Sequence, residues 1–177
     1  PFVALGRMAK AYFTALGTAS SAATIPVTYQ CARNNGVSEE IAGFAVPLCA
    51  TIHLGGSTVK ITAFALAVMQ MTGQSISFGK MAMAILILGV TMVAAPGVPG
   101  GAIAAAQGVL MGFLGFSPEL YSLMVALYVA IDSIGTATNV TGDGAIALIV
   151  NKLAGGSLGS EKGKAMSTAE TIVSATD

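Results

Sequence analysis

Apolar stretches of helical length alternate with short polar interruptions along most of this chain. The main apolar stretches cover residues 2–17, 41–71, 78–93 and 118–153. A helix needs about 20 residues to cross the hydrocarbon core of a bilayer, so the shorter stretches are too short to cross and the longer ones carry interruptions. The pattern therefore predicts an all-α membrane protein built from helical hairpins and broken helices.

The first polar interruption predicts a hairpin turn. Residues 18–26 are small and rich in hydroxyl groups, and they end in Pro26, which suits the first turn of a returning helix. The returning stretch ends at Asn34-Asn35-Gly36, a typical helix stop. We therefore expect a re-entrant hairpin over residues 2–35, followed by a water-facing loop.

Residues 50–58 interrupt the next apolar stretch with two glycines, three hydroxyl side chains and the only histidine of the chain. A backbone break in hydrocarbon leaves unpaired N–H and C=O groups at a cost of several kcal/mol each, so it survives only beside a protein-enclosed or watery cavity. Ser38-Glu39-Glu40 predicts the start of this helix. We expect one interrupted span over residues 41–71, with a binding site at its break.

A second hairpin and a second long helix follow. Residues 94–101 contain two prolines and three glycines and cannot form a regular helix, so they predict the tip of a hairpin over residues 78–116. Ser117-Pro118-Glu119 then supplies an N-cap, a proline in the first turn and an acidic residue. The final helix is expected over residues 118–154, with a glycine break beside Asp143.

The order of a hairpin and then a broken helix therefore occurs twice. Discontinuous helices that recur in two halves of a chain are the best sequence indicator of a secondary transporter's substrate and ion site near the middle of the bilayer. The pattern predicts an inverted repeat in which both hairpin tips reach the same region.

One face of the final helix is polar. Asp132, Thr136, Asn139 and Asp143 follow each other at offsets of four, three and four residues, which places them on the same side. A carboxylate in a spanning helix costs at least ~2.5 kcal/mol, so a functional role is the first hypothesis. The alternative is a structural polar seam in which the carboxylates accept hydrogen bonds from the hairpin backbone.

Two basic side chains also lie in apolar surroundings. His53 in the break is either a packed core histidine or a titratable group of the site. Lys60 must extend to water, pair with an acid or lose its proton. Cys31 and Cys49 form no redox motif and are expected to fill space in the core, although Cys49 also stands among the candidate ion-coupling residues beside the break.

The composition supports a membrane location. Charged residues make up 9% of the chain, against roughly 25% in soluble domains, and hydrophobic residues make up 54%. Eight basic and eight acidic residues leave no basic excess for a nucleic-acid partner. Because the chain begins at Pro1 within an apolar stretch and without a signal peptide, we expect it to be the C-terminal part of a longer protein.

Four groups of motifs, in this order, resemble the dicarboxylate/amino acid:cation symporter family, the glutamate transporter homologues. They are Thr-Ala-Ser-Ser at 18–21 with Ile-Pro-Val-Thr at 25–28, Pro-Leu at 47–48 with Ala-Thr-Ile at 50–52, Gly-Val-Pro-Gly at 97–100, and Asn-Val-Thr-Gly-Asp at 139–143. The resemblance implies a transport domain over residues 1–154: hairpin 1 (2–35), helix 7 (41–71), hairpin 2 (78–116) and helix 8 (118–154). A polar tail would follow at 155–177, and a trimer-forming scaffold would precede residue 1.

The resemblance also implies roles for individual residues. The serines of hairpin 1 would hold an amino acid's carboxylate, hairpin 2 would act as a gate, and helix 8 would bind the amino group and sodium. The candidate substrate-binding residues are Ser20, Ser21, Ser57, Val98, Gly100, Asp132, Gly135, Thr136 and Asn139. The candidate ion-coupling residues are Cys49, His53, Lys60, Asn139 and Asp143, of which Asn139 and Asp143 are the possible sodium ligands.

The chain departs from the family pattern at three positions. Where the family has Asn-Met-Asp-Gly-Thr in helix 7, this chain has His-Leu-Gly-Gly-Ser at 53–57, so a sodium-binding amide and carboxylate are missing. Where carriers of acidic amino acids have an arginine in helix 8, this chain has Gly135, which is expected to leave extra volume. We expect a neutral or polar amino acid substrate, with an acidic amino acid or dicarboxylate as the alternative, and coupling to Na⁺, H⁺ or both.

His53 and Asp143 are predicted to form a proton-sensitive pair where relatives bind sodium. Two other classes of function remain open. A channel or structural subunit would need a continuous polar lining, whereas the polar groups cluster at tips and breaks. A membrane enzyme would need a nucleophile or metal motif, and none is present, so we expect neither catalysis nor a cofactor. The expected location is the plasma membrane, or the inner membrane of a bacterium, crossed several times.

Overall fold

The computed structural model describes the backbone of residues 1–174 and the side chains of residues 1–155. The helices are α1 (Phe2–Arg7), α2 (Ala9–Thr18), α3 (Ser21–Asn34), α4 (Glu39–Ile52), α5 (Gly55–Met71), α6 (Phe78–Met92), α7 (Gly101–Ala105), the π-helix η1 (Gly108–Phe113), α8 (Pro118–Ala130) and α9 (Asp132–Ser174). Residues 1–174 contain no strand, so the prediction of an all-α chain is confirmed for this part.

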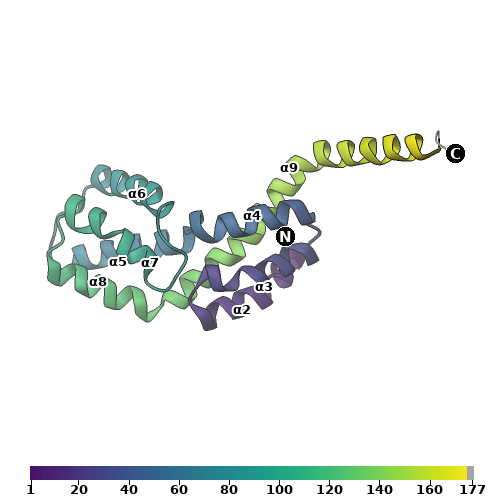
Figure 1. The fold of residues 1–177 in the computed structure, drawn as a ribbon. Helices are drawn as coiled ribbons and strands as arrows, with labels where there is room; N and C mark the ends of the chain where they lie inside the picture. The colour runs from purple at the N-terminus through teal and green to yellow at the C-terminus, as the bar shows by residue number, and fades with distance from the viewer. Residues whose placement is uncertain (175–177) are drawn as a thin grey trace.

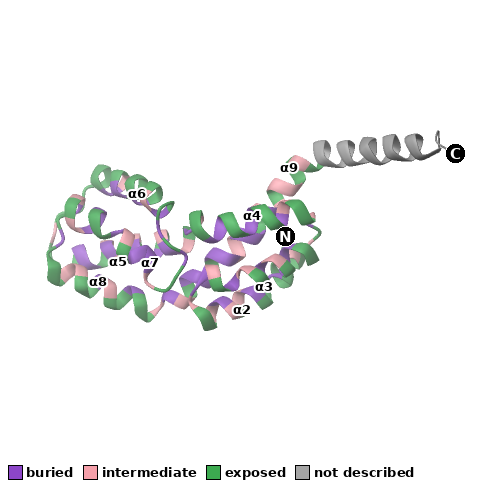
Figure 2. Ribbon diagram, in the orientation of Figure 1, coloured by how far each residue is buried: buried purple, intermediate pink, exposed green. Residues whose placement is uncertain are grey.

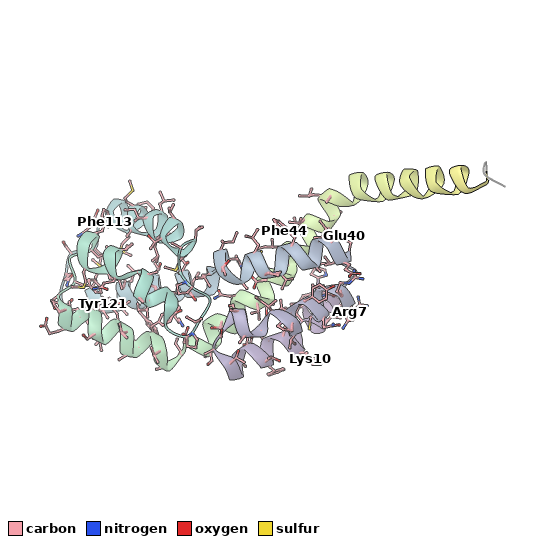
Figure 3. The ribbon with its side chains drawn as sticks, in the orientation of Figure 1. Arg7, Lys10, Glu40, Phe44, Phe113 and Tyr121 are labelled. Carbon is pink, nitrogen blue, oxygen red and sulfur yellow. The ribbon has the colours of Figure 1, made fainter. Side chains whose placement is uncertain are left out.

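The helices form two groups that share α9 (Figure 1). In one group α2, α3 and α4 pack against each other and against the first half of α9. In the other group α5, α6, α7, η1 and α8 enclose the largest apolar core. The buried segments of both groups face inward (Figure 2), while large apolar side chains such as Phe44 on α4 remain exposed (Figure 3).

The first hairpin has a shorter tip than predicted. α2 ends at Thr18, and the turn consists of Ala19, which takes a left-handed conformation with φ of 48°, and Ser20. Ser20 starts α3 early, because its side chain accepts a hydrogen bond from the N–H of Ala23 and so caps the helix. Pro26 therefore lies inside α3 rather than in its first turn, and the predicted tip over residues 18–26 is wrong in its length.

The first broken helix lies where the sequence predicted it. α4 and α5 are separated only by His53 and Leu54, and together they form a segment of 33 residues, Glu39–Met71, long and apolar enough to span a membrane. A second candidate span is the bent pair Pro118–Ala130 and Asp132–Gly155, whose halves meet at 64°. Within the described residues, these two are the spans that length and composition support.

The break in the second long helix is not beside Asp143. It lies at Ile131, between α8 and α9, and α9 passes through Gly142 and Gly144 as regular helix. These two glycines serve close packing instead: a Cβ atom would lie 2.4 Å from His53 Cε1 at Gly142 and 2.5 Å from Met8 Cε at Gly144. Because a glycine can mark close approach as well as a backbone break, the sequence alone misplaced this break.

The second hairpin and the end of the chain complete the fold. Residues 93–100 form the non-helical tip between α6 and α7, and the returning arm consists of α7 and η1. α9 was predicted to end at residue 154 but its helix continues to Ser174. The prediction of a polar tail over residues 155–177 falls almost entirely on residues outside the part whose side chains are described.

Candidate functional site

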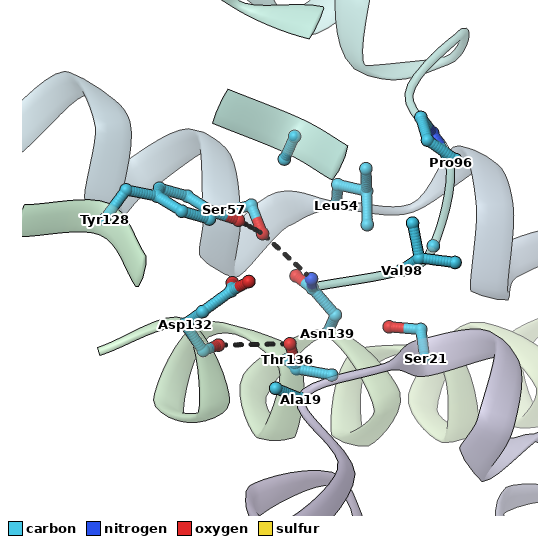
Figure 4. A pocket seen from close by; sticks show the side chains of 12 residues that line it. Ala19, Ser21, Leu54, Ser57, Pro96, Val98, Tyr128, Asp132, Thr136 and Asn139 are labelled. Carbon is cyan, nitrogen blue, oxygen red and sulfur yellow. Dashed lines mark hydrogen bonds between the residues drawn. The ribbon is translucent and has the colours of Figure 1, made fainter. Parts of the chain in front are cut away.

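A pocket lies where both hairpin tips meet the two helix breaks (Figure 4). Its empty volume is about 210 Å³, including space open to solvent, and the side chains and tips around it are closely packed. It is lined by Ala19, Ser21, Leu54, Ser57, Pro96, Gly97, Val98, Ala102, Tyr128, Asp132, Thr136 and Asn139. The lining carries one carboxylate and no basic side chain.

The polar floor of the pocket is a continuous hydrogen-bonded chain. The Tyr128 hydroxyl lies 3.0 Å from Ser57 Oγ, and Asn139 Nδ2 donates to the same Oγ at 3.2 Å. Asn139 Oδ1 accepts the N–H of Gly56 at 2.8 Å, a donor left free at the start of α5. These bonds fix the amide of Asn139 and join α5, α8 and α9 below the pocket.

The two hairpin tips are tied to each other and to α9. Ser20 Oγ donates to the carbonyl of Gly97 at 2.9 Å, and the N–H of Ala22 donates to the same carbonyl at 3.1 Å. The N–H of Gly100 donates to Asp132 Oδ2 at 2.8 Å. A Cβ atom on Gly97 would lie 2.3 Å from the carbonyl oxygen of Ala50, so only glycine allows this tip to lie against α4.

Lys60 reaches the site from the side away from the pocket. Its Nζ lies 3.1 Å from Asp132 Oδ1, and the two side chains are 7% and 8% exposed. The same Nζ donates to the carbonyl oxygens of Tyr128 at 3.5 Å and Ile131 at 3.3 Å. An ammonium has three N–H donors, so Lys60 keeps none for a carboxylate in the pocket.

Gly135 also lies outside the pocket, in contrast to the expectation that it leaves extra volume there. A Cβ atom at this position would lie 3.0 Å from Lys60 Nζ and 3.3 Å from Lys60 Cε. The lysine side chain lies against Gly135, and the open volume beside this glycine belongs to a separate groove rather than to the pocket, where the extra volume was expected.

His53 and Asp143 lie together beside the pocket, although only His53 is at a helix break. His53 Nδ1 is 2.8 Å from Asp143 Oδ1, and the side chains are 30% and 1% exposed. Asp143 Oδ2 is buried and accepts no hydrogen bond from the described residues. Cys49 is buried one turn before His53 and its carbonyl accepts the N–H of His53 at 2.8 Å.

The donor set at Asp143 fits one small cation or proton better than a full sodium cage. Sodium prefers several oxygen ligands. Here Asp143 Oδ2 is free, but Oδ1 faces an imidazole and Asn139 Oδ1 already accepts the N–H of Gly56. Among the described residues, no cluster of three or more His, Cys, Asp or Glu side chains is placed to hold a metal ion.

The structure thus separates the predicted residues into three places. Ser21, Ser57, Val98, Asp132, Thr136 and Asn139 line the pocket, Ser20 and Gly100 brace its two tips, and Lys60, Gly135, His53, Asp143 and Cys49 lie behind or beside it. Their roles in binding stay predictions.

Tyr128 is the main site residue that the sequence analysis missed. Its side chain is buried, its hydroxyl faces Ser57, and its ring centre lies 3.5 Å from Lys60 Nζ. It precedes Asp132 by four residues, so the spacing of the polar face extended one turn further back would have included it. A tyrosine in an apolar stretch is ordinary core, however, and nothing else marked it.

Comparison with known proteins gives one family and a set of related transporters. Residues 1–153 match the model of the family described as "Sodium:dicarboxylate symporter family". Excitatory amino acid transporter 1 of Rattus norvegicus is 32% identical over 154 residues, which are 86% of this chain and 28% of that protein.

Two relatives from Caenorhabditis elegans give the same result. An "Excitatory amino acid transporter" is 34% identical over 144 residues, covering 81% of this chain and 28% of the relative. The "Putative sodium-dependent excitatory amino acid transporter glt-4" is 30% identical over 154 residues, covering 86% and 31%. The chain therefore spans less than a third of the length of these curated relatives.

Proposed function

The chain belongs to the sodium:dicarboxylate symporter family, and from this premise we propose that it is the substrate-binding part of a secondary active transporter for an amino acid. The family and the related proteins are transporters, which confirms the expectation that the chain is not an enzyme. The observation that carries the proposal is the pocket in which two hairpin tips meet two broken helices, the arrangement expected of a transporter's binding site.

Residues 1–154 would form the transport domain of a longer protein. In this proposal the two hairpins are re-entrant and, together with the two broken helices, make an inverted repeat. A scaffold before residue 1 would assemble three copies, and the whole would cross the plasma membrane, or a bacterial inner membrane, several times. The exposed apolar side chains of α4 and α6 support contact with lipid or with such a scaffold.

We favour a neutral or polar amino acid as the substrate. A carrier of a second carboxylate needs a cation that faces the pocket, and the lining holds only the carboxylate of Asp132. Lys60 balances that charge from behind and has no free donor. A zwitterion without net charge matches a site that is neutral overall. An acidic amino acid is the alternative, and the names of the excitatory amino acid transporters favour it.

Ligand binding to the intact protein, expressed from its complete gene, tests the proposal. Purified protein is titrated with each common amino acid and with succinate, and thermal unfolding is followed. A neutral amino acid is expected to raise the melting temperature, because it binds only the folded state. Asn139→Ala should abolish the shift, whereas Thr138→Ala, which changes an exposed neighbour on the same helix, should keep it. No response to any amino acid would overturn the proposal.

The coupling ion is proposed to be a proton, with sodium retained as the alternative. His53 and Asp143 are the titratable side chains that face each other here, from α4 and α9, with the thiol of Cys49 one turn away on α4. An imidazolium beside a carboxylate supplies the charge that a bound cation would supply. The free Asp143 Oδ2 supports a residual cation site, and the family name favours sodium.

A further inference from the structure

Lys60 is the only buried lysine among residues 1–155. It lies inside α5, and its side chain is only 7% exposed. Burying an unpaired ammonium raises the free energy of the folded state, so the groups around it must offset this by pairing with its charge. The surroundings of Nζ therefore indicate why the chain keeps a lysine at this position.

The groups around Nζ are those that a free monovalent cation would choose. They are three oxygen atoms, from the Asp132 carboxylate and the carbonyls of Tyr128 and Ile131, at 3.1, 3.5 and 3.3 Å. The two carbonyls belong to the C-terminal end of α8, where the helix dipole is negative, and the face of the Tyr128 ring lies 3.5 Å away. The α8–α9 break thus forms an oxygen-lined cage for positive charge.

The cage opens on the side away from the pocket. An apolar groove of about 750 Å³, including space open to solvent, leads to Nζ between α5 and α9. It is lined by Gly55, Val59, Ala63, Phe64, Ile134 and Thr138 beside Lys60 itself. Gly135 provides the last piece of space, because a Cβ atom there would lie 3.0 Å from Nζ. This groove is the side from which a small amine could approach the cage once the lysine side chain is removed.

We propose that Lys60 is a tethered cation: its ammonium permanently fills an oxygen-lined site at the α8–α9 break and thereby holds Asp132 in place for the tip of the second hairpin. Asp132 links the two, because Oδ1 faces Lys60 and Oδ2 accepts the N–H of Gly100. Lys60 is therefore a positioning residue rather than a ligand of the substrate. Without it, the same cage should take a cation from solution.

Chemical rescue of Lys60→Ala tests the proposal. The change removes Cγ, Cδ, Cε and Nζ, which n-propylammonium replaces atom for atom. In choline chloride, whose cation is too large and has no N–H donor, the variant of the intact protein should melt several degrees below the wild type, because Asp132 loses its partner. Propylammonium should restore at least half of that loss, and ammonium or potassium should restore part of it.

Three further variants separate this proposal from an ordinary structural ion pair. Lys60→Met fills the same volume without charge and should be destabilised without any rescue. Lys80→Ala removes an exposed lysine on α6 whose Nζ donates to the carbonyl of Leu114 but faces no carboxylate of the described residues, and it should respond to no cation. The double variant Lys60→Ala/Asp132→Asn should melt above Lys60→Ala in choline and ignore propylammonium, because no unpaired carboxylate remains. Should Lys60→Ala not fold, recovery of the folded double variant without added cation is the supporting result.

Equal melting temperatures of Lys60→Ala in choline and in propylammonium would overturn the proposal, as would the same rise in wild type and in Lys80→Ala. This measurement does not depend on transport. A second measurement rests on the proposed function: uptake by Lys60→Ala should fall at least about tenfold in choline and recover in propylammonium. If the stability is rescued but the wild type transports nothing, the proposed function fails and the tethered cation stands.

Discussion

At the scale of single residues, His53 is the side chain on which the proposed ion coupling depends. Its ring contacts Asp143 at 2.8 Å and lies directly against the backbone of Gly142. Histidine is the side chain whose charge most readily changes near physiological pH, which makes this pair the candidate for proton uptake and release in the proposed coupling. Symport with protons means that uptake should rise as the external pH falls, because the inward proton gradient grows.

His53→Asn removes the titrating group and is expected to flatten this pH dependence between about pH 5 and 8. It also restores the amide expected from the family pattern, so part of the uptake is expected to become dependent on sodium. Initial rates of uptake at a series of external pH values, with and without sodium, measure both effects. Lys80→Ala is the matched control and should keep the wild-type profile. If His53→Asn keeps the pH profile of the wild type, His53 has no role in coupling and is a packed core histidine.

The residue scale also explains which parts of the site the sequence could predict. Asp132, Asn139 and Asp143 were recognisable because a carboxylate or amide inside an apolar helix is costly and needs a reason. Tyr128 gave no such signal, since its ring is ordinary in an apolar core. The position of Lys60 next to Gly135 depends on how α5 packs against α9, and this packing cannot be read from a single sequence.

At the scale of elements, the close crossing of α5 and α9 holds the site together. The two helices meet at Gly56, where a Cβ atom would lie 2.7 Å from the carbonyl oxygen of Gly135 and 2.8 Å from Thr138 Cβ. Neither neighbour is the far end of a flexible side chain, so a methyl group must push the helices apart. The same contact lets the N–H of Gly56 reach Asn139 Oδ1.

Gly56→Ala is therefore expected to lower the free energy of unfolding by about 1–3 kcal/mol, the usual cost of overpacking. Gly43→Ala is the matched control, since it lies on the exposed face of α4 with nothing within 4 Å of the added methyl group. The control should leave stability unchanged or raise it slightly, because alanine favours helix over glycine. Thermal unfolding of both variants measures this difference, and equal melting temperatures of Gly56→Ala and Gly43→Ala would contradict the close crossing of α5 and α9.

The elements themselves could be predicted where local chemistry determines them. The break at His53 and the tip over residues 93–100 could be predicted because glycine, proline and hydroxyl residues near them disfavour a continuous helix. The break at Ile131 has neither glycine nor proline. Lys60, which is distant in the sequence but adjacent in space, donates a hydrogen bond to the carbonyl of Ile131 there. Gly142 and Gly144 led to the prediction of a break where the helix is continuous. Their lack of a side chain allows close packing against neighbouring residues instead.

At the scale of the whole molecule, one region joins every element of the site. The two hairpin tips meet through Ser20 and Gly97, and Lys60 of α5 contacts Asp132 next to the second break. The pocket lies between the tips and these helices. The hydrogen bonds that tie the tips are those of Ser20, Ala22 and Gly100, so opening of a tip would have to break them. In the proposed function, alternating access would require such opening at a site to which both halves of the chain contribute.

Uptake of labelled amino acids into proteoliposomes that contain the intact protein is the most direct measurement of this function. The account predicts saturable, gradient-driven uptake of a neutral or polar amino acid that excess aspartate does not inhibit, and its loss in Asn139→Ala but not in Thr138→Ala. Saturable uptake of aspartate at micromolar concentration, unaffected by excess neutral amino acids, would contradict it.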